Sequence, residues 1–162
     1  MCKRILYLAV LVLLLDSCSF VKRIFHRTSV SFYSTAEIKS IIKDAQSLQG
    51  VPYKYGGLDK KGLDCSGLLY TVYLKNEVKI PRVSSDQAEF GQEISLNEVQ
   101  MGDWVFFATG KVGLISHIGL VTKDRPSITF IHASTTYGVR EDLLYQKYWL
   151  DRIIKIIRPY KN

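Results

Sequence analysis

Apolar residues recur at helical spacing between positions 35 and 49 of the chain. The residues on this face are Ile38, Ile41, Ile42, Ala45 and Leu48. Ser34 precedes the segment and Glu37 follows three residues later, which matches a capping box. Gly50 and Pro52, which are typical of a helix end, come directly after it. The pattern therefore predicts an amphipathic helix over residues 35–49 that packs against the core of a domain.

A second helical pattern follows the glycine pair Gly56-Gly57, which marks a tight passage of the backbone. Apolar residues then recur at helical spacing at Leu68, Leu69, Val72 and Tyr73. We expect a helix from about Cys65 to Lys75. Asp64 is its expected N-cap, because an aspartate side chain accepts hydrogen bonds from the free amides of a first turn.

The second half of the chain changes to strand patterns. Four segments rich in β-branched and aromatic residues are expected as strands, at residues 104–107, 117–122, 127–133 and 152–158. Residues 123–126 are expected to form the turn between the second and the third strand. Because helices come first and hairpin-linked strands follow, the order predicts an α+β domain with N-terminal helices packed on an antiparallel β-sheet.

The first twenty residues have the pattern of a secretory signal. A basic start at Lys3 and Arg4 precedes an apolar run of eleven residues, which is too short to span a bilayer comfortably. The run ends in Leu-Asp-Ser-Cys, which resembles a bacterial lipobox, although Asp16 stands where a small uncharged residue is usual. The resemblance implies that Cys18 is acylated and begins the mature chain, so that lipid chains anchor it to a membrane.

These features predict a lipoprotein signal peptide over 1–17, a tether over 18–33 and a folded domain over 34–162. The expected location is the bacterial cell envelope, either at the outer membrane facing the periplasm or at the cell surface. An ordinary cleaved signal and an uncleaved anchor helix remain the alternatives for the first segment.

Composition narrows the class of protein. The chain has 162 residues, of which 47% are hydrophobic and 23% charged, as expected for one globular domain. The formal charge is +7, but no compact basic run carries interleaved aromatic residues. We therefore expect no nucleic-acid partner. The basic surface is either simply solvated or attracted to an anionic wall or lipid headgroup.

The three cysteines, Cys2, Cys18 and Cys65, lie too far apart for a short zinc or redox motif. Cys65 would stand at a helix start, where amide groups lower the pKa of a thiol and favour the reactive thiolate. Ser66 is small enough to let a substrate approach the sulfur, and the Cys65 amide would help to hold an oxyanion. The alternative is a buried structural cysteine.

A nucleophilic cysteine needs a base and a group that orients the base. His117 begins one predicted strand and His132 ends the next, so an antiparallel hairpin places both at the same end of the sheet. Each histidine taken singly fits a satisfied core residue. Together with Cys65 they form a Cys-His-His set, which zinc would also accept, although no pair has the close spacing of a zinc motif.

The chain is similar to the NlpC/P60 family of cysteine peptidases over most of residues 35–160. The similarity rests on the motifs Tyr-Lys-Tyr-Gly-Gly at 53–57, Asp-Cys-Ser-Gly at 64–67, Ser-His-Ile-Gly at 116–119 and Ile-His-Ala-Ser at 131–134. It implies a papain-like core and hydrolysis of peptide bonds in peptidoglycan stem peptides or cross-links. We further expect a monomer that works without a cofactor or metal.

The resemblance assigns roles to individual residues. Cys65 is implied as the nucleophile, His117 as the base and His132 as the residue that orients it. Tyr53 matches a family tyrosine whose hydroxyl assists the oxyanion. Ser66, like Tyr53, is expected to contact the oxyanion or the substrate. From the residues alone, Tyr53 would be a packing residue.

Arg82, Ser84 and Gln87 match a family segment that lines the cleft. From the residues alone, Ser84 and Gln87 predict a capping box that opens a short helix to about Phe90, and Arg82 predicts a salt bridge. Two other functions stay open for the whole domain. One is a non-catalytic wall-binding lipoprotein, and the other is an acyl or amide transferase on the same core.

Overall fold

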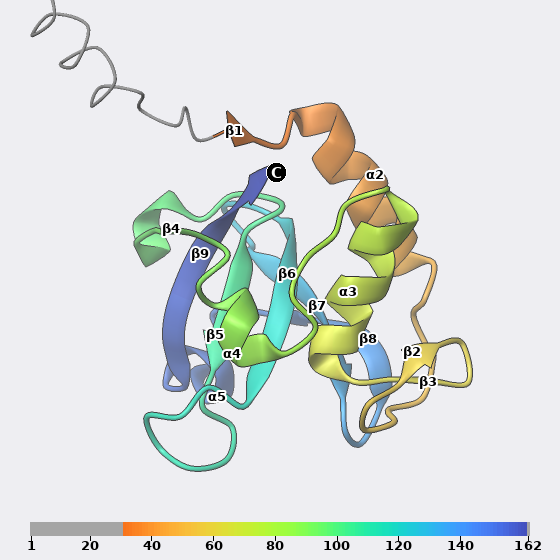
Figure 1. Cartoon of the computed structure of the whole chain (residues 1–162). Helices are drawn as coiled ribbons and strands as arrows, with labels where there is room; N and C mark the ends of the chain where they lie inside the picture. The colour runs from red at the N-terminus through yellow and green to blue at the C-terminus, as the bar shows by residue number, and fades with distance from the viewer. Residues whose placement is uncertain (1–30, 162) are drawn as a thin grey trace, which may run out of the picture. The chain divides into compact units, whose positions relative to one another are not determined.

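The structure is a computed structural model that describes residues 31–161 (Figure 1). Its main sheet is antiparallel throughout and has the strand order β1-β9-β5-β6-β7-β8. The strands are β1 (Ser31–Phe32), β5 (Trp104–Phe107), β6 (His117–Lys123), β7 (Thr129–Ser134), β8 (Gly138–Leu143) and β9 (Ile153–Lys161). A further strand, β4 (Gly91–Glu93), also pairs with β9. The predicted α+β class with an antiparallel sheet is confirmed.

The helices are short and precede most of the sheet in sequence. They are α2 (Thr35–Gln46), α3 (Cys65–Lys75), α4 (Ser84–Gln87), the 3-10 turn η1 (Leu96–Glu98) and α5 (Lys147–Leu150). A two-stranded ribbon of β2 (Leu58–Asp59) and β3 (Gly62–Leu63) lies between α2 and α3 in sequence. Figure 1 shows α2 and α3 together on one side of the main sheet.

The capping residues explain where the two longer helices begin. The backbone N–H of Ser34 donates to Glu37 at 2.8 Å, and the Ser34 hydroxyl accepts from the Glu37 N–H, which confirms the capping box. Helix α2 ends at Gln46, three residues earlier than predicted, and hydrogen-bonded turns carry the chain to Gly50. Helix α3 has the predicted bounds and the predicted cap, Asp64.

Alternating side chains of the sheet form two hydrophobic clusters. On the helix side, Trp104 and Phe106 of β5 pack with the buried faces of α2 and α3. The indole N–H of Trp104 donates to the Tyr73 hydroxyl of α3 at 2.9 Å, which satisfies both polar atoms within the core. On the other side, Val105 and Phe107 pack with residues of β6, β7, α5 and β9. Helix α3 is thereby held firmly against the sheet.

Several elements differ from the sequence prediction. Ser84 does not cap α4, because the N-cap is Val83 and no side chain bonds to it, so the predicted capping box is wrong. Ser31 and Phe32 belong to β1 and pair with β9, so the packed chain includes residues that were assigned to the tether. Strands β4 and β8 were not predicted. Cys2, Cys18 and the proposed signal peptide lie outside the described residues.

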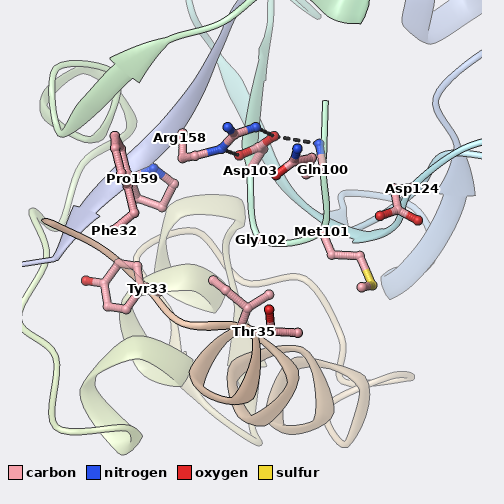
Figure 2. Close-up of a pocket in the computed structure, with 11 residues that line it drawn as sticks. Phe32, Tyr33, Thr35, Gln100, Met101, Gly102, Asp103, Asp124, Arg158 and Pro159 are labelled. Carbon is pink, nitrogen blue, oxygen red and sulfur yellow. Dashed lines mark hydrogen bonds and ion pairs between the residues drawn. The ribbon is translucent and has the colours of Figure 1, made fainter. Parts of the chain in front are cut away.

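Residues 100–103 form a turn before β5, in which the Asp103 N–H donates to the Gln100 carbonyl at 3.2 Å. Asp103 is buried and accepts hydrogen bonds from the Gln100 N–H at 2.7 Å and from the Arg158 guanidinium at 2.9 and 3.1 Å. Figure 2 shows this group at one side of a hollow of about 250 Å³ that Tyr33 also lines. Because Asp103 precedes β5 and Phe107 ends it, the hollow lies at the opposite end of β5 from His117.

None of the helices within residues 31–161 combines the length and the apolar character that crossing a bilayer requires.

Candidate active site

The site is built around the first residue of α3, Cys65, which follows the N-cap Asp64. The Asp64 carboxylate accepts a hydrogen bond from the Gly67 N–H at 2.6 Å, which is a normal N-cap contact. Its other oxygen accepts from the Gly56 N–H at 2.8 Å. One buried carboxylate therefore fastens the glycine loop to the helix start and fixes the backbone on both sides of Cys65.

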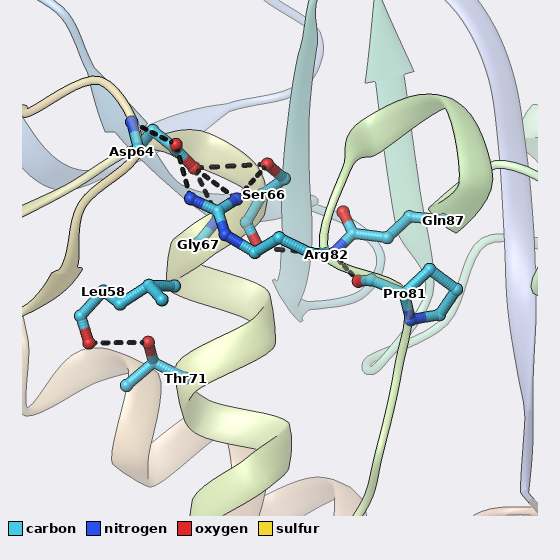
Figure 3. Close-up of polar contacts among 9 residues, drawn as sticks. Leu58, Asp64, Ser66, Gly67, Thr71, Pro81, Arg82 and Gln87 are labelled. Atoms are coloured by element: carbon cyan, nitrogen blue, oxygen red, sulfur yellow. Dashed lines mark hydrogen bonds and ion pairs between the residues drawn. The ribbon is translucent and has the colours of Figure 1, made fainter.

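Arg82 completes this arrangement, as Figure 3 shows. Its guanidinium donates to both Asp64 oxygens, at 3.1 and 2.7 Å, and to the Ser66 hydroxyl at 2.8 Å. The Ser66 hydroxyl in turn donates to Asp64 at 3.2 Å. Arg82 thus forms the predicted salt bridge, and it binds Asp64 through two contacts that restrict its geometry. The Ser66 hydroxyl thus both donates and accepts a hydrogen bond within this network.

Gln87, which matched a cleft-lining segment, is fully buried below this network. Its side-chain amide donates to the backbone carbonyls of Ser66 at 3.2 Å and Pro81 at 2.8 Å (Figure 3). It therefore ties the chain that carries Arg82 to the first turn of α3. The role seen in the structure is to support the helix start.

The Cys65 thiol is buried, and this burial is the main influence on its pKa. Burial raises the pKa of Cys65 above its ordinary value, because the ionised form loses contact with water. Hydrogen bonds from the backbone amides of Ile118, Ser66 and Cys65 itself oppose the rise without cancelling it. The sequence predicted a lowered pKa at the helix start, and that direction is wrong. The Ile118 contact also places the sulfur beside the start of β6, next to His117.

His117 and His132 are brought together as predicted at one end of the sheet. Nε2 of His117 lies 2.8 Å from Nδ1 of His132, and both side chains are buried. Nε2 of His132 lies 3.0 Å from a carboxylate oxygen of Asp142 on β8. Because Nε2 of His117 is engaged with His132, Nδ1 is the ring nitrogen of His117 that remains for Cys65.

Trp149 of α5 covers the two histidines. Its ring is stacked on the His117 ring with 5.7 Å between centroids and 19° between planes, and it meets the His132 ring edge-on at 4.9 Å. Burial lowers the pKa of His117 to about 3, with the nearby His132 as a second cause. Burial also lowers the pKa of His132, against the opposing effect of Asp142. Both imidazoles are therefore neutral near pH 7, as a general base must be.

Tyr53 lies near Cys65, on a bridge that pairs it with Leu63 just before the helix. Partial burial raises the pKa of its hydroxyl, and the proximity of Cys65 and then Asp64 adds to the rise. A hydroxyl that stays protonated is a hydrogen-bond donor. Within residues 31–161 no group of three or more His, Cys, Asp or Glu side chains is placed to hold a metal ion.

A hollow of about 390 Å³ opens beside the histidine pair. Its walls include His117, His132 and Trp149, together with Tyr137, Arg140 and Tyr148. Tyr137 and Tyr148 are 70% and 50% exposed, so the rim of the hollow is aromatic and open to a ligand.

Three residues of the site were missed by sequence reasoning. Asp142 and Arg140 lie on β8, and Trp149 lies on the four-residue helix α5. The chain has only two tryptophans, and this rarity is the one sequence signal that could have drawn attention to Trp149.

Comparison with known proteins identifies the class to which this fold and site belong. The NlpC/P60 family model matches residues 50–158, which is more than half of the chain. The chain belongs to the NlpC/P60 family. The matched segment includes Cys65, both histidines, Asp142 and Trp149.

Individual relatives agree with this assignment. The chain is 37% identical over 117 residues to the probable endopeptidase NlpC of Escherichia coli K12, covering 72% of this chain and 74% of the relative. It is 34% identical over 118 residues to the murein DD-endopeptidase MepS/murein LD-carboxypeptidase of the same organism, covering 72% of this chain and 60% of the relative. A lipoprotein-like NLP/P60 structure from Staphylococcus aureus superposes with a TM-score of 0.71 at 32% identity, covering 89% of this chain and 48% of the other.

Proposed function

We propose that this protein is a cysteine endopeptidase that hydrolyses peptide bonds in the stem peptides or cross-links of peptidoglycan. The observation that carries the proposal is the position of Cys65 at the start of α3, bonded to the backbone of Ile118, which directly follows His117 of the bonded pair His117 and His132. Membership of the NlpC/P60 family and the endopeptidase names of the two Escherichia coli relatives support the reaction and the substrate.

In the proposed reaction, Cys65 and His117 begin as a neutral pair, because burial raises the pKa of the thiol and lowers that of the imidazole. The thiol proton moves to Nδ1 of His117 while the sulfur electron pair forms a bond to the carbonyl carbon of the stem peptide. The C–N bond then breaks, and His117 returns the proton to the leaving amine. Water attacks the resulting thioester with His117 as base, which releases the new carboxylic acid and the Cys65 thiol.

The oxyanion of the tetrahedral intermediate needs donors that are already in place. The Cys65 N–H belongs to the first turn of α3, where amides lack helical partners and the helix dipole favours negative charge. The Tyr53 hydroxyl is the proposed second donor, since its raised pKa keeps it protonated next to Cys65. Ser66 would contribute through its backbone N–H.

His132 is proposed to orient His117 rather than to exchange protons with the substrate. Its Nδ1 fixes the His117 ring through the 2.8 Å contact and leaves Nδ1 of His117 available to accept the thiol proton. Trp149 covers this contact and excludes water from it. Removing His132 should therefore cost less activity than removing His117, because loss of orientation leaves the base itself in place.

For the location, we propose the cell envelope with a lipid anchor on Cys18, based on the lipobox-like sequence that ends at that residue. Metabolic labelling with an alkyne fatty acid tests this anchor. The wild-type chain should take up the label and remain with membranes, whereas Cys18→Ala should not. Equal labelling of both chains would contradict the proposed attachment site.

Digestion of purified peptidoglycan tests the proposed activity. The wild-type protein should release soluble muropeptides, and mass spectrometry of the new termini should identify the bond that is cut. Cys65→Ala should release none, with an unchanged circular dichroism spectrum showing that it is folded. Undiminished release by Cys65→Ala would overturn the proposal.

The same experiment separates the alternative functions. A wall-binding protein would bind peptidoglycan without releasing fragments, and its binding would not depend on the Cys65 thiol. A transferase would yield new amide or ester products when an acceptor amine or alcohol is added, whereas a hydrolase yields free carboxylates. Incorporation of oxygen from H₂¹⁸O into the new carboxylate would support hydrolysis.

A further inference from the structure

We propose that Asp142 is a positioning residue of this site, which sets the tautomers of His132 and His117 so that Nδ1 of His117 is free to accept the Cys65 proton. The inference rests on the proposed function for the role of Cys65. It adds a fourth side chain, from a strand that the sequence did not predict, to the set of Cys65, His117 and His132.

The side chains of His117, His132 and Asp142 form one continuous row of hydrogen bonds. Nε2 of His117 lies 2.8 Å from Nδ1 of His132, and Nε2 of His132 lies 3.0 Å from Oδ2 of Asp142. In the β7–β8 ladder, Asp142 is the register partner of Phe130, two residues before His132. His132 is 1% exposed and the Asp142 side chain 11%, so water competes little with these contacts.

The direction of each hydrogen bond in the row follows from the carboxylate of Asp142 at its end. A carboxylate only accepts hydrogen bonds, so Nε2 of His132 must carry the proton that points to Asp142. A neutral imidazole carries one proton, so Nδ1 of His132 is an acceptor. Nε2 of His117 must then be the donor to it, and Nδ1 of His117 keeps its lone pair. This is the tautomer that a general base toward Cys65 requires.

Arg140 holds the carboxylate in this orientation. Its Nη2 donates to Oδ1 of Asp142 at 2.6 Å, which leaves Oδ2 for His132. The charged and titratable groups that face Asp142 are thus Arg140 on its own strand and His132 on β7. Beyond them lie His117 on β6 and Cys65 of α3, which bonds to the backbone of the following residue, Ile118. Trp149 covers the row from α5 and contributes no charge.

Asp142→Asn should reverse the direction of each hydrogen bond in this row. An arginine only donates, so the amide oxygen of the new side chain would stay on Arg140 and its NH₂ would turn to His132. Nε2 of His132 would then accept, Nδ1 of His132 would donate to His117, and Nδ1 of His117 would carry a proton. In that tautomer His117 cannot take the thiol proton. In a serine protease, an aspartate-to-asparagine change at the equivalent role lowers kcat by on the order of 10⁴-fold for this reason.

The experiment uses the full chain with Asp142→Asn, Asp142→Glu and Asp124→Asn. Asp124 lies in the loop after β6, at the far end of the sheet, and serves as a matched control. Long-range ¹H–¹⁵N spectra of histidine-labelled protein report which ring nitrogen carries the proton. The wild type and Asp124→Asn should show protonated Nε2 on both His117 and His132. Asp142→Asn should show protonated Nδ1 on both.

Peptidoglycan release should fall by on the order of 10²- to 10⁴-fold in kcat for Asp142→Asn, with little change in KM. Asp142→Glu keeps a carboxylate acceptor and should keep the wild-type tautomers with a smaller loss. Wild-type tautomers in Asp142→Asn, or protonated Nδ1 in the wild type, would overturn the proposal. The spectra do not depend on turnover, so a protein that lacks peptidase activity but shows these tautomers would contradict the proposed function alone.

Discussion

The ring of Trp149 is stacked on the ring of His117, with 5.7 Å between their centroids and an interplanar angle of 19°. The same indole meets His132 edge-on, so a single side chain covers the hydrogen bond between the two histidines. This cover explains how two imidazoles in the wall of an open hollow can both be buried.

We expect Trp149→Ala to impair His117 in its proposed role as the base and to destabilise the fold. Water would reach His117, its charged form would become less costly, and its pKa would rise from about 3 toward its ordinary value of about 6.5. Activity that the wild type keeps at about pH 5 should then be lost in the variant as His117 becomes protonated. The free energy of unfolding should fall by about 3–5 kcal/mol. Activity measured from pH 4 to 8 reports the change in the pKa of His117, and urea denaturation reports the change in the free energy of unfolding.

The control for this prediction is Trp149→Phe, which keeps an aromatic ring over the histidines. It should retain most activity at about pH 5 and lose less stability than the alanine variant. An identical acid limb in the wild type and in Trp149→Ala would mean that the indole does not set the pKa of His117.

A second prediction concerns the protonation of Cys65. Because burial raises the pKa of its thiol above 9.0, the sulfur should react with iodoacetamide slowly at pH 6 and progressively faster as the pH rises beyond 9. Peptide-level mass spectrometry follows Cys65 separately from Cys2 and Cys18. Rapid labelling with a midpoint at mildly acidic pH would instead indicate a resting thiolate paired with a protonated His117.

A third prediction concerns the salt bridge between Arg82 and Asp64. Arg82→Met removes two contacts to a carboxylate whose side chain is 9% exposed, so the charge of Asp64 loses its cationic partner. We expect the free energy of unfolding to fall by about 3 kcal/mol and the activity to fall with it, because the loop before Cys65 is loosened. Arg125→Met is the control, because Arg125 contacts Leu96 and Asn97 through exposed hydrogen bonds.

The pH dependence gives this prediction a further check. The pKa of Asp64 is lowered below its ordinary 3.8 in the folded chain by hydrogen bonds from Arg82 and from the Gly67 amide, although burial acts against them. Below that value the unfolded chain binds the proton more tightly, so this contribution to stability is present at neutral pH and is lost in acid. Arg82→Met should reduce the loss. Parallel stability curves for the two proteins below pH 4 would contradict the role of Arg82.

Helical spacing, capping residues and hairpin geometry predicted the parts of the site whose placement depends on residues close in sequence. The bounds of α3 and the Asp64 cap follow from helical spacing and capping chemistry, and they fixed the position of Cys65 at the helix start. The position of His117 and His132 at one end of the sheet followed from hairpin geometry. The pKa of Cys65 could not be predicted in this way, because it depends on burial against β6, which is a tertiary contact.

The parts that were missed have weak local patterns. Strand β8 has the sequence Gly-Val-Arg-Glu-Asp-Leu, whose three central charges are not typical of a strand, and it lies at the edge of the sheet. Helix α5 has four residues, too few to show a helical period. Asp142 and Trp149 therefore reach the histidines through elements that tertiary packing stabilises, and a single sequence carries little sign of them.

The last prediction concerns Gly67, which lies in the first turn of α3 two residues after Cys65. A Cβ atom at this position would clash with the carbonyl oxygen of Gly57 and lie close to Asp64 and Arg82. Gly67→Ala should therefore push the glycine loop away from the helix start and lower the free energy of unfolding by about 1–3 kcal/mol. It should also reduce kcat, because the displacement moves the Cys65 sulfur and the neighbouring amide donors out of position. Gly110→Ala is the matched control, because the nearest atom to its added Cβ is 3.8 Å away. Equal stability and activity of the two variants would show that the close approach at Gly67 is not needed to position Cys65.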